Sequence, residues 1–200
     1  MKKIILSLTA LLSIAFVNAQ SKSEGFSKGS IYVSGGFGFN STNDKDTELK
    51  SSSYKFSPSA AYFVTSNLAV GAKLNFGGGS KDVQVNDTTT ATTKNSTTGF
   101  GVFGRYYFTP ASKFSVYANL GVDYNSTKPN TDDDFKENEL GIAITPGINY
   151  FLSNHFSMEA SYGRLGYTST KSNVSGAKGT TSFGLDLDLS TISFGLNYKF

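Results

Sequence analysis

The sequence predicts an all-β protein with antiparallel strands, and three observations support this class. Apolar and polar residues alternate in many short segments, as expected where successive side chains of a strand point to opposite faces. The chain is rich in residues that favour strands and turns, with 17 Phe, 11 Tyr and 21 Gly. After residue 19 it contains no apolar run of the length that a membrane-spanning helix needs.

The amino terminus predicts export. Residues 1–19 have the pattern of a signal peptide, with Lys2 and Lys3 before an apolar run and a small-residue cleavage site at Val17-Asn18-Ala19. The alternative, an uncleaved membrane anchor, is disfavoured because a spanning helix needs about twenty apolar residues. Residues 20–200 are therefore predicted to form one mature domain.

Charge and cysteine content exclude several classes of function. The formal net charge of the whole chain is +3, and cleavage after residue 19 removes two lysines, which leaves +1. A nearly neutral domain gives no reason to expect a nucleic-acid partner. The chain has no cysteine, so disulfides and thiolate metal sites are excluded.

Eight segments show the alternation of a strand. They are residues 29–40, 53–63, 68–76, 100–108, 114–125, 140–150, 156–163 and a last strand that ends at Phe200. The clearest is the fifth, which places Phe114, Val116, Ala118, Leu120, Val122 and Tyr124 on one face.

The connections between these segments alternate in length. Residues 40–51, 77–98, 126–139 and 169–181 are predicted as long loops, whereas 65–67, 109–112 and 153–155 are short turns. Long loops at one end, short turns at the other and an even number of strands are typical of one architecture. The predicted fold is an eight-stranded antiparallel up-and-down transmembrane β-barrel.

Four positions predict local irregularity. Pro58 and Pro146 lie inside predicted strands, where each removes a donor from the ladder, so a bulge is expected at both. The alternation also slips by one residue near Arg164 and again near Ser190, which predicts two further bulges.

The distribution of aromatic residues decides which face meets lipid. A soluble barrel of the lipocalin kind has the same alternation turned inside out. Here aromatic residues gather at strand ends, which predicts girdles at two membrane interfaces. The predicted girdle residues are Tyr62, Tyr106, Phe108, Phe114, Tyr124, Tyr150, Phe156 and Tyr198.

The opposite face predicts a narrow, charged lumen. It carries five charged residues, Lys55, Lys73, Arg105, Asp123 and Glu159. Charges confined in such a space should pair, and Arg105 and Glu159 lie at similar distances from short turns. An internal network that plugs the barrel is the preferred interpretation, and a selectivity constriction in a conducting pore is the alternative. Bulky inward residues, namely Tyr32, Phe103, Tyr107 and Tyr117, favour a plugged barrel.

The last ten residues, TISFGLNYKF, alternate strictly and end on Tyr198-Lys199-Phe200. This end, with the strand pattern of the mature chain, resembles small outer-membrane β-barrel proteins of the outer membrane protein A type, often labelled as a porin family. The resemblance implies the outer membrane of a Gram-negative bacterium, with both termini periplasmic, and implies that Tyr198 and Phe200 form part of the signal for the assembly machinery. Implied partners are outer-membrane lipid and lipopolysaccharide, with a monomeric barrel.

Three functions are compatible with the sequence. They are a structural or surface-interaction role, a small-solute porin-like channel and a lipid-modifying enzyme. The only histidine, His155, lies in a short turn at the end opposite the rim where barrel enzymes of this kind carry theirs, so the protein is predicted not to be an enzyme. No catalytic residue, cofactor or metal site is predicted, although the run Asp132 to Asp134 could hold a cation.

Overall fold

A computed structural model describes residues 25–45, 49–86, 89–130, 135–174, 176–188 and 192–200. The regular structure of these residues consists entirely of strands. Their bounds are β1 (Ile31–Asn43), β2 (Lys50–Phe63), β3 (Leu68–Asn86), β4 (Thr89–Tyr107), β5 (Phe114–Pro129), β6 (Glu137–Phe151), β7 (Phe156–Ser161), β8 (Arg164–Ser172), β9 (Thr180–Asp186) and β10 (Ser193–Lys199). Across these ranges, no helix is long and apolar enough to cross a membrane.

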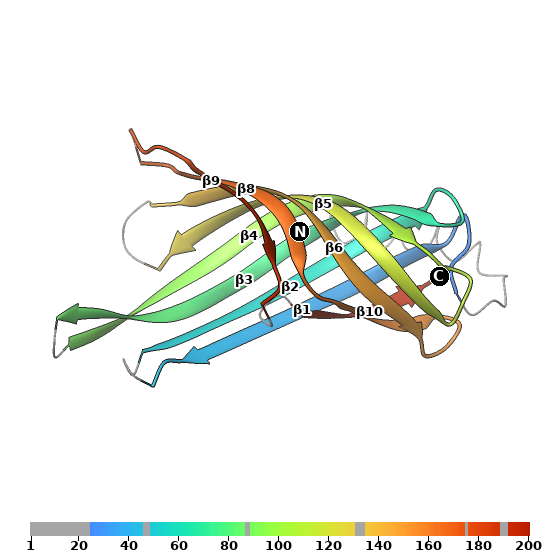
Figure 1. The fold of residues 1–200 in the computed structure, drawn as a ribbon, viewed down its shortest axis with the longest axis horizontal. Helices are drawn as coiled ribbons and strands as arrows, with labels where there is room; N and C mark the ends of the chain where they lie inside the picture. Colours follow the sequence, from blue (N-terminus) through green and yellow to red (C-terminus); the bar gives the residue numbers. More distant parts are fainter. Residues whose placement is uncertain (1–24, 46–48, 87–88, 131–134, 175, 189–191) are drawn as a thin grey trace, which may run out of the picture.

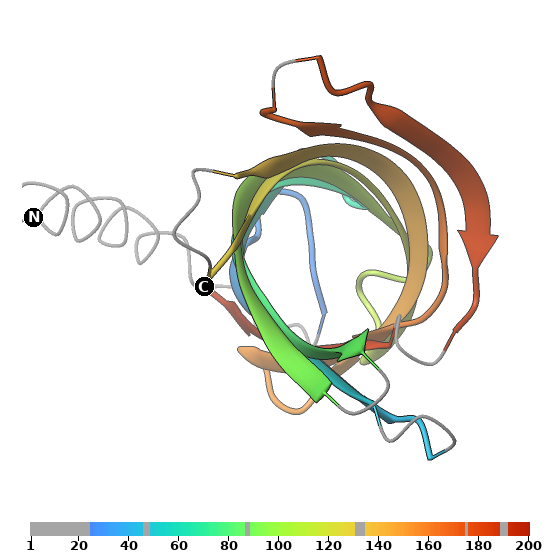
Figure 2. The same cartoon turned by 90° about the vertical axis from the view of Figure 1, so that its left-hand side faces the viewer.

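The strands close into a barrel of eight, as predicted (Figure 1). Every pairing is antiparallel, and the first strand joins the last through β1 and β10. The seventh strand is divided into β7 and β8, and the eighth into β9 and β10. Viewed along the axis, the β8–β9 hairpin stands outside the ring of the other strands (Figure 2).

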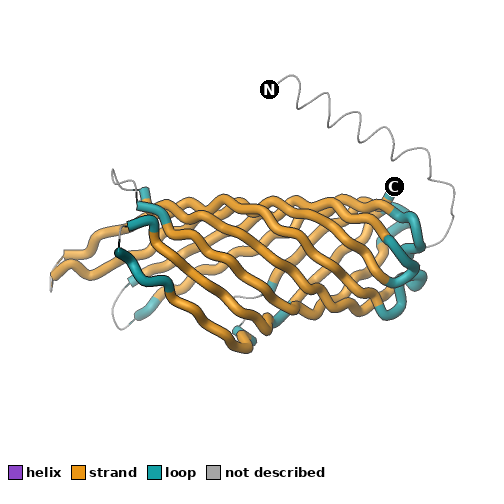
Figure 3. Tube along the Cα trace, turned by 90° about the horizontal axis from the view of Figure 1, so that it is seen from above, coloured by secondary structure: helices purple, strands orange, loops and turns teal. Residues whose placement is uncertain are grey.

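The strands extend further than the sequence predicted. Residues 77–98 were expected to form a loop, but β3 runs to Asn86 and β4 begins at Thr89, with the two strands paired along this length. The other three expected long loops, 40–51, 126–139 and 169–181, are also partly strand, and the extended strands project from one end of the barrel (Figure 3). Loops were predicted because these segments lack an apolar face. They form strands nevertheless, because Thr favours the strand conformation even where no apolar face is present.

The two proline bulges are not present. β1 and β2 keep one register through Gly35↔Pro58, and β5 and β6 keep one register through Ala118↔Pro146. Each proline instead lies where the second neighbour of its strand is not paired with it. Pro58 pairs with β1 but not with β3. Pro146 pairs with β5 and lies where the other neighbour of β6 changes from β8 to β7. A missing N–H donor therefore leaves the continuous ladder intact.

The slip predicted near Arg164 is present. Between the pairs Ile144↔Leu165 and Gly147↔Ser161, three steps along β6 face four steps along the seventh strand. The extra residue lies at the break between β7 and β8, where Gly163 has a φ of 80° that other residues rarely adopt. Ser190 lies outside the described residues.

The two faces of the wall have opposite exposure. Apolar residues on the outer face are open, with Leu120 53% and Phe100 60% exposed, whereas the inward Tyr32 and Tyr107 have no exposed surface. A soluble barrel would show the reverse, so the lipocalin-like alternative is excluded. A continuous apolar outer face on a closed barrel is suited to lipid.

The outer face predicts how the barrel responds to a charge placed at different depths. Leu120→Arg should lower the free energy of unfolding by about 2–4 kcal/mol, because Leu120 lies halfway along β5 and would face the middle of the bilayer. Leu152→Arg, at a similarly exposed residue in a short turn, should cost at most about 1 kcal/mol. Urea titration of each variant in lipid vesicles measures both, and equal losses would contradict a lipid-facing wall.

Candidate functional site

Five aromatic rings close the lumen at the end that carries the short turns. Phe26, which precedes β1, lies at their centre, with its ring centroid 4.7 Å from Phe63, 4.8 Å from Phe151 and 5.2 Å from both Tyr32 and Tyr107. All five side chains are buried. We call Phe26, Tyr32, Phe63, Tyr107 and Phe151 the aromatic plug.

Backbone contacts hold Phe26 in this position. Its N–H donates to the carbonyl of Pro110 at 2.7 Å, and the Lys199 Nζ donates to the carbonyl of Gly25 at 2.5 Å. Gly25 has a φ of 124°, and a Cβ at this residue would lie 2.5 Å from the backbone of Ala111. A glycine is therefore required where the chain enters the barrel mouth.

A buried amide cluster adjoins the plug. The Asn197 Nδ2 donates to the Asn149 Oδ1 at 3.0 Å and to the Glu159 Oε2 at 3.1 Å, and the Ser157 hydroxyl donates to the Asn149 Oδ1 at 2.9 Å. These side chains come from three neighbouring strands, β6, β7 and β10. Their hydrogen bonds connect the plug end of the wall to the charged residues further inside.

Arg105 and Glu159 form the next layer. The Arg105 Nη1 lies 2.6 Å from the Glu159 Oε2, and the two side chains are only 11% and 12% exposed. The Arg105 Nε donates to the Asn119 Oδ1 at 3.2 Å, and its guanidinium carbon lies 4.2 Å from the centre of the Tyr117 ring. The guanidinium is thus paired, hydrogen-bonded and stacked, as a buried cation requires.

Large lumen side chains lie against glycines on the neighbouring strand. Tyr117 pairs with Gly147, Phe103 with Gly71, Glu159 with Gly195 and Asp123 with Gly101. A Cβ on Gly71 would lie 2.5 Å from the Phe103 ring, and one on Gly195 would lie 2.8 Å from the Glu159 side chain. Such glycines therefore provide the space in which the lumen side chains pack.

The five predicted lumen charges do not form one network. Lys73 and Asp123 make a second pair, with 3.0 Å between Nζ and Oδ1, and the Asn75 Nδ2 also donates to the Asp123 Oδ1 at 3.0 Å. Lys55 belongs to neither pair. Among the described residues it has no ion-pair partner, and the nearby carboxylate of Asp123 is already bound by Lys73.

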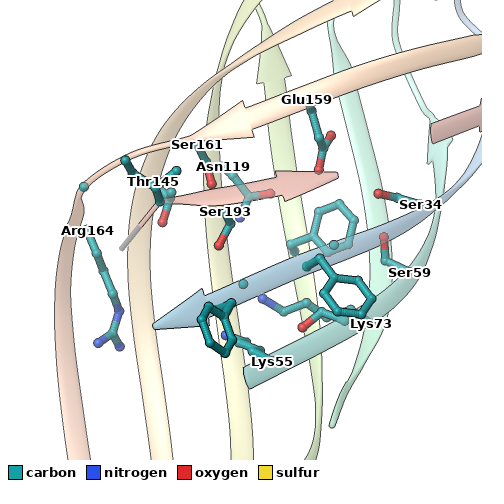
Figure 4. Close-up of a pocket in the computed structure, with 18 of the residues that line it drawn as sticks. Ser34, Lys55, Ser59, Lys73, Asn119, Thr145, Glu159, Ser161, Arg164 and Ser193 are labelled. Carbon is teal, nitrogen blue, oxygen red and sulfur yellow. The ribbon is translucent and has the colours of Figure 1, made fainter. Parts of the chain in front are cut away.

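Beyond the Arg105–Glu159 layer the lumen opens into a cavity of about 390 Å³. Phe103, Arg105, Tyr117 and Glu159 line its inner end. Figure 4 shows Lys55, Lys73 and Arg164 among the side chains around this space. The Arg164 Nη2 donates to the Thr168 hydroxyl at 3.1 Å and, like Lys55, has no ion-pair partner in the described part of the chain.

Several of the predicted girdle and terminal residues contact one another across neighbouring strands. Cross-strand pairs bring Phe114 to Tyr150 and Phe156 to Tyr198 near the short turns, whereas Tyr124 lies further along β5, 5.8 Å from Phe100. Tyr198 also contacts Phe200, with 5.0 Å between their centroids. The roles of these residues in membrane anchoring and assembly stay predictions.

His155 is tied to the last strand. Its Nδ1 lies 2.9 Å from the backbone oxygen of Lys199, and its ring stacks on Tyr198 with 5.7 Å between centroids. It therefore holds a structural contact in the short turn, away from the cavity.

No group of three potential metal ligands occurs among the residues that the structure describes. Asp132 to Asp134 lie outside those residues. The expected absence of a cofactor, a metal and catalysis remains a prediction.

Sequence reasoning missed four of the residues that contribute to this lumen. Phe26 precedes the first strand, so no alternation identifies its side chain as inward. Asn149 and Asn197 lie on the polar face and carry no charge that would single them out. Arg164 could have been found, because a one-residue slip at the break returns it to the lumen face.

An apolar outer face and side chains that fill the lumen are typical of β-barrel proteins embedded in a membrane. The chain belongs to the family of outer membrane protein β-barrel domains, whose model matches residues 7–200. Among curated proteins, none matches this chain.

Two solved structures illustrate the likeness in fold. The outer membrane protein OprG from Pseudomonas aeruginosa is 19% identical, with a TM-score of 0.57 over 89% of this chain and 99% of that one. Neisserial surface protein A is 15% identical, with a TM-score of 0.50 over 87% and 99%. Likeness at these identities concerns the fold alone.

The two ion pairs predict different sensitivities. Glu159→Gln should lower the free energy of unfolding by about 3–5 kcal/mol, because it leaves the Arg105 cation buried without a counter-charge. Asp123→Asn should cost less, about 1–3 kcal/mol, because the Lys73–Asp123 pair is 21% and 23% exposed.

A double-mutant cycle separates pairing from general damage. Arg105→Met combined with Glu159→Gln should lose less than the sum of the single losses, since contacting residues are coupled. Urea titrations in lipid vesicles provide the four free energies. Additive losses would mean that the two side chains do not interact in the membrane.

Proposed function

We propose that this protein is a non-conducting barrel with a structural or surface-interaction role in the outer membrane of a Gram-negative bacterium. The observation that carries the proposal is the closure of the lumen by two successive layers, the aromatic plug and the Arg105–Glu159 layer. Water and solutes have no open path through stacked rings and a buried, stacked ion pair.

Orientation follows from how such a barrel is made. A chain exported through its signal peptide and inserted from the periplasm leaves both termini and the short turns on the periplasmic side. The plug then faces the periplasm, and the extended strands and the cavity face outward, toward lipopolysaccharide. Tyr198 and Phe200 present the terminal signal to the assembly machinery, and the closed ring of strands needs no second copy.

A small-solute channel is the second candidate, favoured by the cavity and its lining charges. It would require both closed layers to move. A lipid-modifying enzyme has less support, because His155 lies at the short-turn end and is bonded to the last strand.

Conductance in a planar lipid bilayer tests closure. The unmodified protein should give no reproducible steps, whereas Phe26→Ala combined with Tyr117→Ala should give small ones, because it removes one ring from each layer. The matched control, Phe108→Ala with Phe114→Ala, removes two outward rings and should stay silent. Reproducible steps from the unmodified protein would favour the channel.

A further inference from the structure

The cavity beyond the Arg105–Glu159 layer is positively charged. Four cations line it, Lys55, Lys73, Arg105 and Arg164. Glu159 and Asp123 are each bound to one of these cations, and a third carboxylate, that of Glu139, lies near Arg164 beside Gly141. Four cations therefore face three carboxylates, which leaves an excess of one positive charge in a space whose apolar walls strengthen its field.

The same cavity reaches the outer surface between β1 and β10. Among the described residues, the pairing of these strands ends at Phe37↔Phe194, while β1 continues to Asn43. Phe37, Phe39 and Tyr54 are outward-facing and 60%, 73% and 56% exposed, yet they line the cavity together with the inward Lys55 and Ser193. Residues of both faces of the wall therefore border this space.

This passage has apolar walls. Phe37 and Phe39 border it from β1, and Ile192 borders it beside β10. At its inner side, Gly38 lies close to Lys55, since a Cβ there would be in ordinary contact, 3.8 Å from the Ser193 hydroxyl and 3.9 Å from the Lys55 side chain. An apolar border thus adjoins Lys55, which has no ion-pair partner within the described part of the chain.

From these features we infer that the cavity is a binding site for a single-chain amphiphile with an anionic head group. The carboxylate or phosphate head lies between Lys55 and Arg164, and the apolar chain runs outward past Phe37, Phe39 and Ile192. A volume of about 390 Å³ is in the range of small-molecule sites. The inner end is closed by Arg105 and Tyr117, so the site is blind toward the short turns.

Octanoate is a suitable probe because it is soluble and combines one carboxylate with a short chain. Binding is measured by titration calorimetry with the protein in phosphatidylcholine nanodiscs, after subtraction of the signal from empty nanodiscs. We expect one saturable octanoate site, with octanol and acetate each at least about tenfold weaker, because each lacks one half of the recognised chemistry. Equal binding of octanol and octanoate would overturn the anionic assignment, and equal binding of acetate would overturn the amphiphile.

Charge variants test the head-group position. Lys55→Met and Arg164→Met should each weaken octanoate binding at least about tenfold. Lys28→Met removes the same charge from an exposed turn outside the cavity and should change nothing. Heat-modifiable gel migration verifies that each variant is folded. Unchanged affinity in folded Lys55→Met and Arg164→Met would refute the site.

A reversible crosslink tests the passage. Because the chain has no cysteine, Gly38→Cys with Ser193→Cys introduces a single possible disulfide across it. Oxidation should weaken octanoate binding at least tenfold, and reduction should restore it. Full binding to the oxidised protein would show that the chain does not lie between β1 and β10, and would overturn the proposal.

Discussion

The narrow interior of an eight-stranded barrel is the constraint on which the rest of this structure depends. An interior only wide enough for side chains cannot hold two large residues side by side at one level. Tyr117, Phe103 and Glu159 each meet this limit by lying against a glycine of the neighbouring strand. The packed Tyr117 ring then supports the Arg105 guanidinium within reach of Glu159. Many glycines of this chain therefore serve packing rather than flexibility.

Charge and burial change together along the barrel axis. The short-turn end holds the aromatic plug and a buried cation, Lys199, whose Nζ donates to the carbonyl of Gly25 and lies 5.3 Å from the centre of the Phe151 ring. The Arg105–Glu159 pair follows, then the more exposed Lys73–Asp123 pair, and then Lys55 and Arg164, which have no ion-pair partner among the described residues. This order links closure at one end to recognition at the other: unpaired cations are tolerated only where the lumen widens and a ligand or water can reach them.

The sequence predicted what depends on periodicity. Alternation in the fifth strand identified its lipid face, and the distances of Arg105 and Glu159 from short turns placed them at one depth. It did not predict Phe26, whose position depends on Pro110 and Lys199 rather than on any local pattern. Residues 77–98 were misjudged because strands outside lipid need no apolar face. Among the described residues Lys55 has no ion-pair partner, and Lys73, not Lys55, binds Asp123. Residue spacing does not predict which of the two lysines forms that pair.

The central claim is that Phe26 closes the lumen from inside, and hydrogen exchange at its amide tests this most directly. The Phe26 N–H donates to the carbonyl of Pro110, so in folded protein in micelles it should exchange as slowly as the strand amides of the barrel. Nuclear Overhauser contacts from its ring to Tyr107 and Phe151 should accompany this protection. Exchange at the rate of an unstructured segment, without those contacts, would mean that the short-turn mouth is open and would contradict the account.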